Sequence, residues 1–314
     1  MPRGLWAFIA KRLIMAVPVF IGVTLVTFVL MYIVPGDPVA LLMEEKTAAI
    51  DPAAARLIRA KWGLDDPAPV QYLKFVRNAL VGDLGISYRT NQPVLEEVLR
   101  RVPATAKLAG AALLVGILIG VPMGILAALR QNTIFDSASI VGATMGVSIP
   151  NFWLGILLIY LLAVHLRWLP PSGYGPPFPY LIMPAITLGT GLSAVLARLT
   201  RSSMLEVIRQ DFVRTARAKG LSERRVIAVH ALRNAAIPIV TIVGVQISGL
   251  LSGAVITERV FSWPGVGRLL VDSIGVRDLP MAQGCVLLIA TIFIGLNLLV
   301  DLSYAWLDPR IKYE

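Results

Sequence analysis

Three kinds of residue are scarce in this 314-residue chain, and each scarcity excludes a class of protein or site. A single cysteine, Cys285, leaves no disulfide framework and no cysteine-based metal site. The two histidines, His165 and His230, are too far apart in sequence to form a zinc-type His-x-x-x-His pair. Charged residues make up 15% of the chain, against about 25% in a soluble domain, and hydrophobic residues make up 56%. The composition therefore excludes a soluble globular protein.

Sequence signatures of energy coupling are also missing. The phosphate-binding pattern Gly-x-x-x-x-Gly-Lys-Ser/Thr does not occur, so this chain is not expected to hydrolyse ATP itself. Ion-coupled transporters place ionisable groups inside their spans, at a cost of about 2.5–3.5 kcal/mol each, whereas Asp136, Glu258 and Asp301 lie at span ends. Backbone carbonyls can also hold sodium, so an ATP-independent secondary transporter or channel stays as an alternative. A membrane-embedded enzyme, the other alternative, would need a catalytic pair that the histidines do not supply.

Six windows without Asp, Glu, Lys or Arg predict an all-α integral membrane protein with six transmembrane helices. Each window holds roughly 20 apolar residues, enough to cross a hydrocarbon core of about 30 Å as a helix. The windows are Leu13 to Gly36, Leu108 to Leu129, Ser137 to Val164, Trp168 to Ala197, Asn234 to Thr257 and Leu279 to Val300.

Basic residues predict the orientation of these spans. The first window follows Arg3, Lys11 and Arg12 and is too long for a cleavable signal peptide, so residues 1–34 are expected to stay as a signal-anchor helix. Nine Lys and Arg residues gather between Arg198 and Arg233, which by the positive-inside rule puts this segment and both termini in the cytoplasm. The net charge of +10 is thus explained by orientation and contact with anionic membrane lipid, and nucleic acid is not expected as a partner.

The expected organisation is one membrane domain with one insert. Residues 35–106 form an extracytoplasmic insert with a Gly-punctuated turn at Gly82-Asp-Leu-Gly85 and a short helix near Val94 to Arg101. Residues 107–314 form a core of five helices with a cytoplasmic loop at 200–236 and an extracytoplasmic loop at 258–280. Within the second span, small residues recur every four positions, which predicts close helix packing at Gly116, Gly120 and Gly124. Pro122 and Pro150 are expected to bend their helices.

The basic loop is predicted to form a helix-turn-helix elbow. Met204, Leu205, Ile208 and Phe212 share one helical face. Gly220 suits the position after a helix end and Ser222 the N-cap of a second short helix. Packing of Val226, Val229 and Leu232 on the bundle would leave a basic surface for a soluble partner at Lys219, Glu223, Arg224 and Arg225. An amphipathic elbow lying on anionic lipid is the alternative.

This loop resembles the EAA motif of ABC-importer permeases. Arg214-Thr215-Ala216 and Gly220 align with its Glu-Ala-Ala, three residues, Gly pattern, but Arg214 replaces the usual Glu and Arg233 stands where the motif has Pro. These departures resemble the dipeptide, oligopeptide, nickel and glutathione branch. Further matching motifs extend over nearly the whole chain: Pro35-Gly-Asp-Pro38, Gly82-Asp-Leu-Gly85, Trp168-Leu-Pro170, His230 to Pro238, Val260-Phe-x-Trp-Pro-Gly-x-Gly-Arg-Leu-Leu270 and Asp308-Pro-Arg-Ile-Lys-Tyr313. The long insert resembles that of the first permease of such systems.

The resemblance implies a type I ABC-importer-like permease, a non-catalytic subunit in a bacterial inner membrane. It implies pairing with a second, homologous permease, with two ATPase subunits that bind ATP and Mg, and with an extracytoplasmic substrate-binding protein; no cofactor or metal is expected on this chain. The ATPase-coupling residues would be Arg214, Thr215, Ala216, Lys219, Gly220, Ser222, Glu223, Arg224 and Arg225. The outer loop contacting the binding protein or ligand would use Phe261, Trp263, Pro264, Gly265 and Arg268. The substrate, whether dipeptide, oligopeptide, glutathione or nickel complex, stays open.

Overall fold

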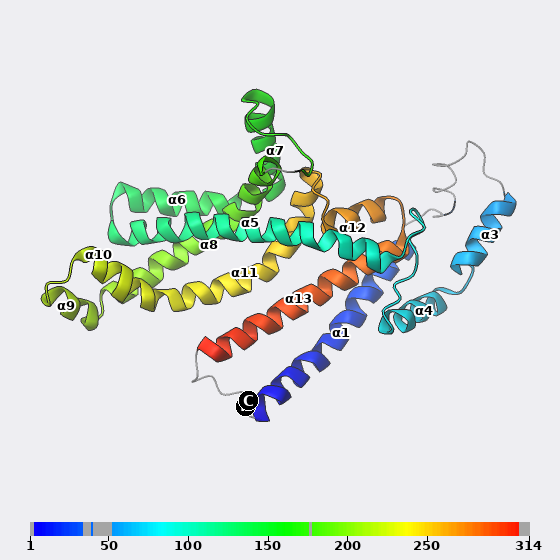
Figure 1. The fold of residues 1–314 in the computed structure, drawn as a ribbon, viewed down its shortest axis with the longest axis horizontal. Coiled ribbons are helices and arrows are strands. Elements are labelled where there is room, and N and C mark those ends of the chain that lie inside the picture. Colours follow the sequence, from blue (N-terminus) through cyan, green and yellow to red (C-terminus); the bar gives the residue numbers. More distant parts are fainter. Residues whose placement is uncertain (1–2, 34–38, 40–51, 176–177, 308–314) are drawn as a thin grey trace. The chain divides into compact units, whose positions relative to one another are not determined.

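The structure, a computed structural model, describes residues 3–33, 39, 52–175 and 178–307. Within these ranges the regular structure is helical, apart from one isolated antiparallel bridge between Ile86 and Pro93. Figure 1 shows the arrangement of the helices along the chain. The predicted all-α architecture is confirmed.

Among the described residues, five helices are long and apolar enough to cross a membrane. Each exceeds the roughly 20 residues that a hydrocarbon core requires, and each overlaps one of the predicted windows. They are α1 (Arg3–Ile33), α5 (Val94–Leu129), α8 (Pro179–Ile208), α11 (Leu232–Val260) and α13 (Leu279–Leu307).

The remaining window, Ser137 to Val164, forms a sharply bent pair of helical arms, which makes the sixth predicted span when the pair is counted as one. α6 (Ile134–Ser148) is followed by α7 (Asn151–Leu158) and the π-helical η1 (Ile159–His165), and the two arms meet at 101°. The break falls at Ile149, which is extended at ψ 122°, and Pro150. Proline has no backbone N–H and disfavours a helical residue before it, so the predicted bend at Pro150 is confirmed.

α5 is longer than predicted. The short helix expected near Val94 and the span expected from Leu108 are one continuous helix of 36 residues. Pro103 and Pro122 both lie inside this helix. The helix therefore extends well beyond its apolar window.

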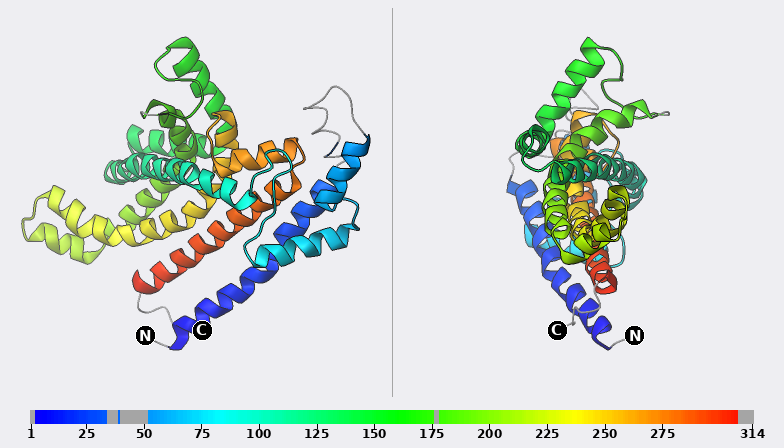
Figure 2. Two further views of the ribbon diagram at one scale, coloured as in Figure 1. Left: turned by 45° about the vertical axis from the view of Figure 1, so that its right-hand side comes forward. Right: turned by 90° about the vertical axis from the view of Figure 1, so that its left-hand side faces the viewer.

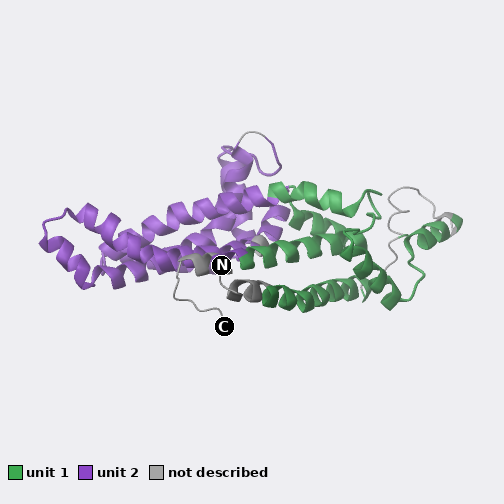
Figure 3. Ribbon diagram, turned by 60° about the horizontal axis from the view of Figure 1, so that its bottom comes forward, with its two compact units in different colours: residues 1–104, 264–298, 310–314 green, residues 105–263, 299–309 purple. Residues whose placement is uncertain are grey.

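The chain divides into two compact units (Figure 3). The described parts of residues 105–263 and 299–309 form one unit, in which α8 lies at the centre and contacts α6, α7 and α11. α5 approaches α8 through small residues: a Cβ built on Gly120 would lie 2.5 Å from the Ser193 carbonyl oxygen, and one on Gly124 2.5 Å from that of Ala197. Gly116 lies against the Leu192 side chain, with its Cβ position 2.5 Å from Cδ2. The predicted spacing of glycines thus marks a face where two backbones nearly touch.

The other unit comprises the described parts of residues 1–104 and 264–298. It contains α1, α3 (Pro52–Trp62), α4 (Ala68–Leu80), α12 (Val266–Gly275) and the first part of α13. An apolar cluster holds the turn after α4 against the starts of α5, α12 and α13; its buried members are Leu84, Val94, Val98, Val266, Met281 and Cys285. α1 contacts α4, where Thr24 Oγ1 and Tyr72 Oη lie 3.1 Å apart.

Asp278, at the start of α13, joins two segments of this unit by hydrogen bonds. Its buried carboxylate accepts hydrogen bonds from the Ser87 hydroxyl, the Tyr88 and Arg89 amides at 3.1 and 3.3 Å, and the Met281 amide at 3.3 Å. Asp278 therefore caps α13 and ties the Gly82-to-Arg89 turn to it.

Candidate functional site

The connection between α8 and α11 forms a helical elbow, residues 209–225, at the far end of its unit (Figures 1 and 2). It contains α9 (Asp211–Ala218) and α10 (Glu223–Arg225), and the π-helical η2 (Val226–Ala231) joins α10 to α11. The predicted elbow is present, with two corrections. Met204, Leu205 and Ile208 belong to α8, and the second helix is the beginning of the long α10, η2 and α11 run rather than a separate short helix.

The inner face of the elbow packs on the ends of the long helices. Val213 and Ala216 are buried against a cluster formed by Ala128, Met204, Val207, Val226, Ile227, Ala231 and Ala235. Phe212, predicted on the same helical face as Met204, is 38% exposed, because extended Gln210 interrupts the helix after α8 and the spacing from Met204 does not continue across it. Val226 is buried as predicted, whereas Val229 is 48% exposed and lies in a π turn that departs from 3.6-residue spacing.

Gly220 ends α9 with a Schellman motif. Its amide donates to the Arg217 carbonyl at 2.9 Å, and the Leu221 amide donates to the Ala216 carbonyl at 3.4 Å. Gly220 has φ +74°, a conformation that glycine adopts without the steric cost of a Cβ. The apolar side chain of Leu221 then packs against the inner cluster. The glycine thus fixes the direction of the turn between α9 and α10.

The outer face of the elbow is polar and predominantly basic. The exposed side chains there are Arg214, Thr215, Lys219, Ser222, Glu223, Arg224 and Arg225. Ala216, predicted in the same set, points inward and packs. Ser222 occupies the N-cap position of α10, but its hydroxyl makes no capping hydrogen bond; its carbonyl accepts from Arg225 and Val226 instead.

An ion pair that the sequence analysis missed spans the turn. Arg217 donates to Glu223 through Nη2 at 2.6 Å and Nε at 3.1 Å, so both carboxylate oxygens are engaged. This hydrogen bond raises the pKa of Arg217. A two-point contact fixes the relative orientation of α9 and α10 better than a single one. Glu223 therefore acts within the elbow rather than as a free surface group.

Three of the five residues predicted to form the outer contact of the 258–280 loop are buried. Phe261 and Trp263 are 1% and 3% exposed; Phe261 lies against Gly155, and Tyr174 meets Trp263 edge-on at 4.8 Å between ring centroids. Gly265, the N-cap of α12, is also buried, while Pro264 and Arg268 are half-buried. The two aromatic side chains pack within their unit, which leaves Pro264 and Arg268 as the accessible part of the predicted contact.

Two carboxylates predicted at span ends are buried and partnered. Asp136, in the first turn of α6, receives Arg201 from α8 through Nε at 2.5 Å and Nη2 at 2.7 Å, and the Asn132 amide at 3.0 Å. Glu258, near the end of α11, is 0% exposed and accepts from Thr105 Oγ1 at 2.7 Å. Burial of each charge is thus compensated by hydrogen bonds, as it must be in a low-dielectric interior. Across the described residues, no group of three or more His, Cys, Asp or Glu is arranged to hold a metal ion.

The apolar helices and the exposed elbow between two of them define a polytopic membrane protein. The chain belongs to the family described as binding-protein-dependent transport system inner membrane component, whose model matches residues 120–313, with the corresponding N-terminal model matching residues 5–109. It is accordingly a multi-pass protein of the inner membrane, a membrane subunit of a transport system.

Curated relatives match almost end to end. The dipeptide transport system permease protein DppB of Escherichia coli K12 is 43% identical, with 98% of this chain and 99% of the relative covered. The di/tripeptide transport system permease protein DppB of Pseudomonas aeruginosa is 44% identical and the oligopeptide transport system permease protein AppB of Bacillus subtilis 40% identical, with the same coverage.

Solved structures share the fold. A chain of the methionine ABC transporter MetNI, in an inward-facing conformation, matches with a TM-score of 0.56 and 20% identity over 68% of this chain and 96% of that one. A chain of an amino acid ABC transporter with histidines matches with a TM-score of 0.52 and 16% identity over 66% and 92%.

Proposed function

We propose that this chain is a permease subunit of an ATP-driven, binding-protein-dependent importer of short peptides, either dipeptides and oligopeptides or glutathione. It would form half of the translocation pathway beside a second, homologous permease. Two ATPase subunits would bind ATP and Mg, and an extracytoplasmic protein would deliver substrate. The chain itself would be non-catalytic. The end-to-end similarity to permeases of peptide transport systems supports this assignment.

The elbow is the proposed contact with the ATPase subunits. The observation that supports this role is that one side of the elbow is apolar and packed while the other is basic and exposed. Its apolar side is anchored on α5, α8 and η2, so force applied to the basic side reaches the long helices. Lys219, Arg224 and Arg225 lie exposed on either side of the braced turn. ATP-driven movement of a partner held there would tilt the helices and expose the pathway alternately to each side.

Two elbow variants test this proposal in the importer reconstituted in liposomes. Gly220→Asp forces a side chain into a left-handed conformation, and a triple reversal, Lys219→Glu with Arg224→Glu and Arg225→Glu, inverts the basic surface. Both are expected to insert normally but to reduce dialanine uptake per ATP hydrolysed by at least about tenfold, the effect of about 1.4 kcal/mol. Uptake and phosphate release are measured in parallel.

Gly82→Asp is the matched control, because Gly82 has φ +83° and open space around its Cβ position but lies outside the elbow. It should keep the normal ratio of uptake to hydrolysis. Normal ratios in both elbow variants would remove the coupling role, and uptake that needs no ATPase would contradict the proposed function.

A further inference from the structure

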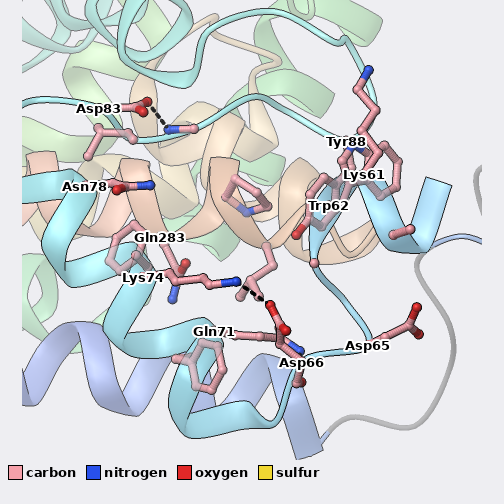
Figure 4. Close-up of a pocket in the computed structure, with 18 residues that line it drawn as sticks. Lys61, Trp62, Asp65, Asp66, Gln71, Lys74, Asn78, Asp83, Tyr88 and Gln283 are labelled. Atoms are coloured by element: carbon pink, nitrogen blue, oxygen red, sulfur yellow. Dashed lines mark hydrogen bonds and ion pairs between the residues drawn. The ribbon is translucent and has the colours of Figure 1, made fainter. Parts of the chain in front are cut away.

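The insert contains a cavity of about 640 Å³ (Figure 4). Its walls come from α1, α3, α4, the Asp83-to-Tyr88 turn and the start of α13, all within one compact unit. Small-molecule sites usually measure about 300–1,000 Å³, so this cavity could hold a ligand of two or three amino acids. Neither the family match nor the proposed coupling at the elbow assigns it a role.

One wall is aromatic. The rings of Trp62 and Tyr88 stack with their centroids 4.2 Å apart and their planes 16° apart. Burial raises the pKa of Tyr88, and the nearby Asp278 carboxylate raises it further, so its hydroxyl stays neutral at physiological pH. Such a wall accepts apolar side chains of varied shape.

A buried amide points into the same cavity. Gln283 is 3% exposed, and its Nε2 has no hydrogen-bond partner among the described residues. Figure 4 shows its side chain directed into the space beside Lys74. Buried donors without acceptors are rare and unfavourable, so this one suits a ligand oxygen. The capping contacts of Asp278, five positions earlier on the chain, hold the start of this helix in place.

Charges of both signs surround the amide. Lys74 pairs with Asp66 at 2.6 Å, and their side chains are 61% and 35% exposed, so the pair is weak enough to exchange partners. Lys61 and Asp65 also line the cavity. A ligand that carries one ammonium and one carboxylate, joined by amides, matches this distribution better than a purely anionic or cationic one.

We propose that the cavity binds a short peptide with free termini. Gln283 and Lys74 would donate to its carboxylate or last carbonyl, Asp65 would face its ammonium group, and Trp62 and Tyr88 would contact a side chain. This inference rests on the proposed peptide import and adds a binding site on the permease itself, separate from the substrate-binding protein.

Calorimetric titration of the purified permease–ATPase complex, without its binding protein, tests the site. L-alanyl-L-alanine is expected to bind, and its N-acetyl amide, which lacks both terminal charges, is expected to bind at least about tenfold more weakly. Gln283→Leu should weaken dialanine binding about tenfold by removing the donor. Asn297→Leu, the same type of change on the same helix but outside the cavity, should bind as the unaltered complex does.

Thermal unfolding distinguishes a lost contact from a lost fold. Gln283→Leu removes an unsatisfied buried donor, so its midpoint should equal or exceed that of the unaltered complex. The inference would be overturned if dialanine did not bind, if Gln283→Leu bound dialanine as tightly as the unaltered complex, or if the blocked peptide bound as tightly as dialanine. Each of these results would count even where ATP-dependent uptake with the binding protein is normal. Failure of that uptake for every peptide would instead contradict the proposed function.

Discussion

Gly120 shows how one residue limits the distance between two spans. The Cβ of any other residue would lie 2.5 Å from the Ser193 carbonyl and 2.9 Å from the Leu196 Cβ, closer than non-bonded atoms approach. Gly189 presents the same feature from α8, with a Cβ position 2.7 Å from the Ala112 carbonyl. Without a strong hydrophobic force between helices in lipid, such close backbone packing is a main source of association.

Gly120→Ala is therefore expected to destabilise the protein. Relief of the clash must move backbone rather than a flexible side-chain end, which costs about 1–3 kcal/mol in a packed interior. Thermal unfolding of the detergent-purified chain should show a lower midpoint. Gly110→Ala, on the same helix with nothing within 4 Å of its Cβ position, should leave the midpoint unchanged or raise it. Equal midpoints for the two variants would contradict the role assigned to Gly120.

At the scale of the element, the elbow is held by different interactions on its two sides. The apolar cluster under Val213 and Ala216 anchors it, while the Arg217 and Glu223 pair braces the turn from outside. These side chains are 39% and 58% exposed, so the pair adds at most about 1 kcal/mol to stability. Its effect is on the geometry of α9 relative to α10.

A charge exchange tests this brace. Glu223→Arg places two arginines opposite each other and is expected to reduce uptake per ATP hydrolysed severalfold, with little change in the unfolding midpoint. Arg217→Glu combined with Glu223→Arg restores a pair of opposite charges and should recover most of the loss. A double variant as impaired as the single one would contradict a bracing role.

Sequence patterns predicted the long apolar helices that a membrane requires, but they missed features that depend on tertiary packing. Charge-free windows located the long helices, since an unpaired charge inside a span is costly. Pro150 signalled its bend, but extended Gln210, which ends the continuity between α8 and α9, carries no distinctive signal. Asp136 and Arg201 are 65 positions apart, so one sequence gives no reason to pair them. Asp278 could have been recognised as a helix cap, since it directly precedes an apolar window with Pro280 at its second position.

At the scale of the whole molecule, the chain presents more apolar surface than its own helices cover. α1 presents large apolar side chains between its buried positions, with Ile14, Leu30 and Ile33 exposed at 70%, 60% and 69%, and other large apolar side chains are exposed on α5 and α6. Lipid covers exposed apolar surface of this kind in any membrane protein. A second permease subunit would cover a continuous part of the same surface.

Affinity purification of the tagged chain from native membranes is expected to yield a second permease of this family and one or two ATPases that carry the phosphate-binding loop. The triple elbow reversal should keep the second permease and recover less ATPase, since only the basic surface has changed. A chain that purifies alone and moves solute without ATP would contradict the assembly.

The π-helical turn η2 has a consequence for the elbow. A π turn holds one more residue than an α turn, and successive residues of an α-helix are about 100° apart around the axis. The π turn at Val226–Ala231 therefore directs Arg224 and Arg225 about 100° away from where an uninterrupted α-helix would place them relative to α11. Because η2 is packed against α5, α8 and the elbow, this direction of the basic surface is fixed by the fold.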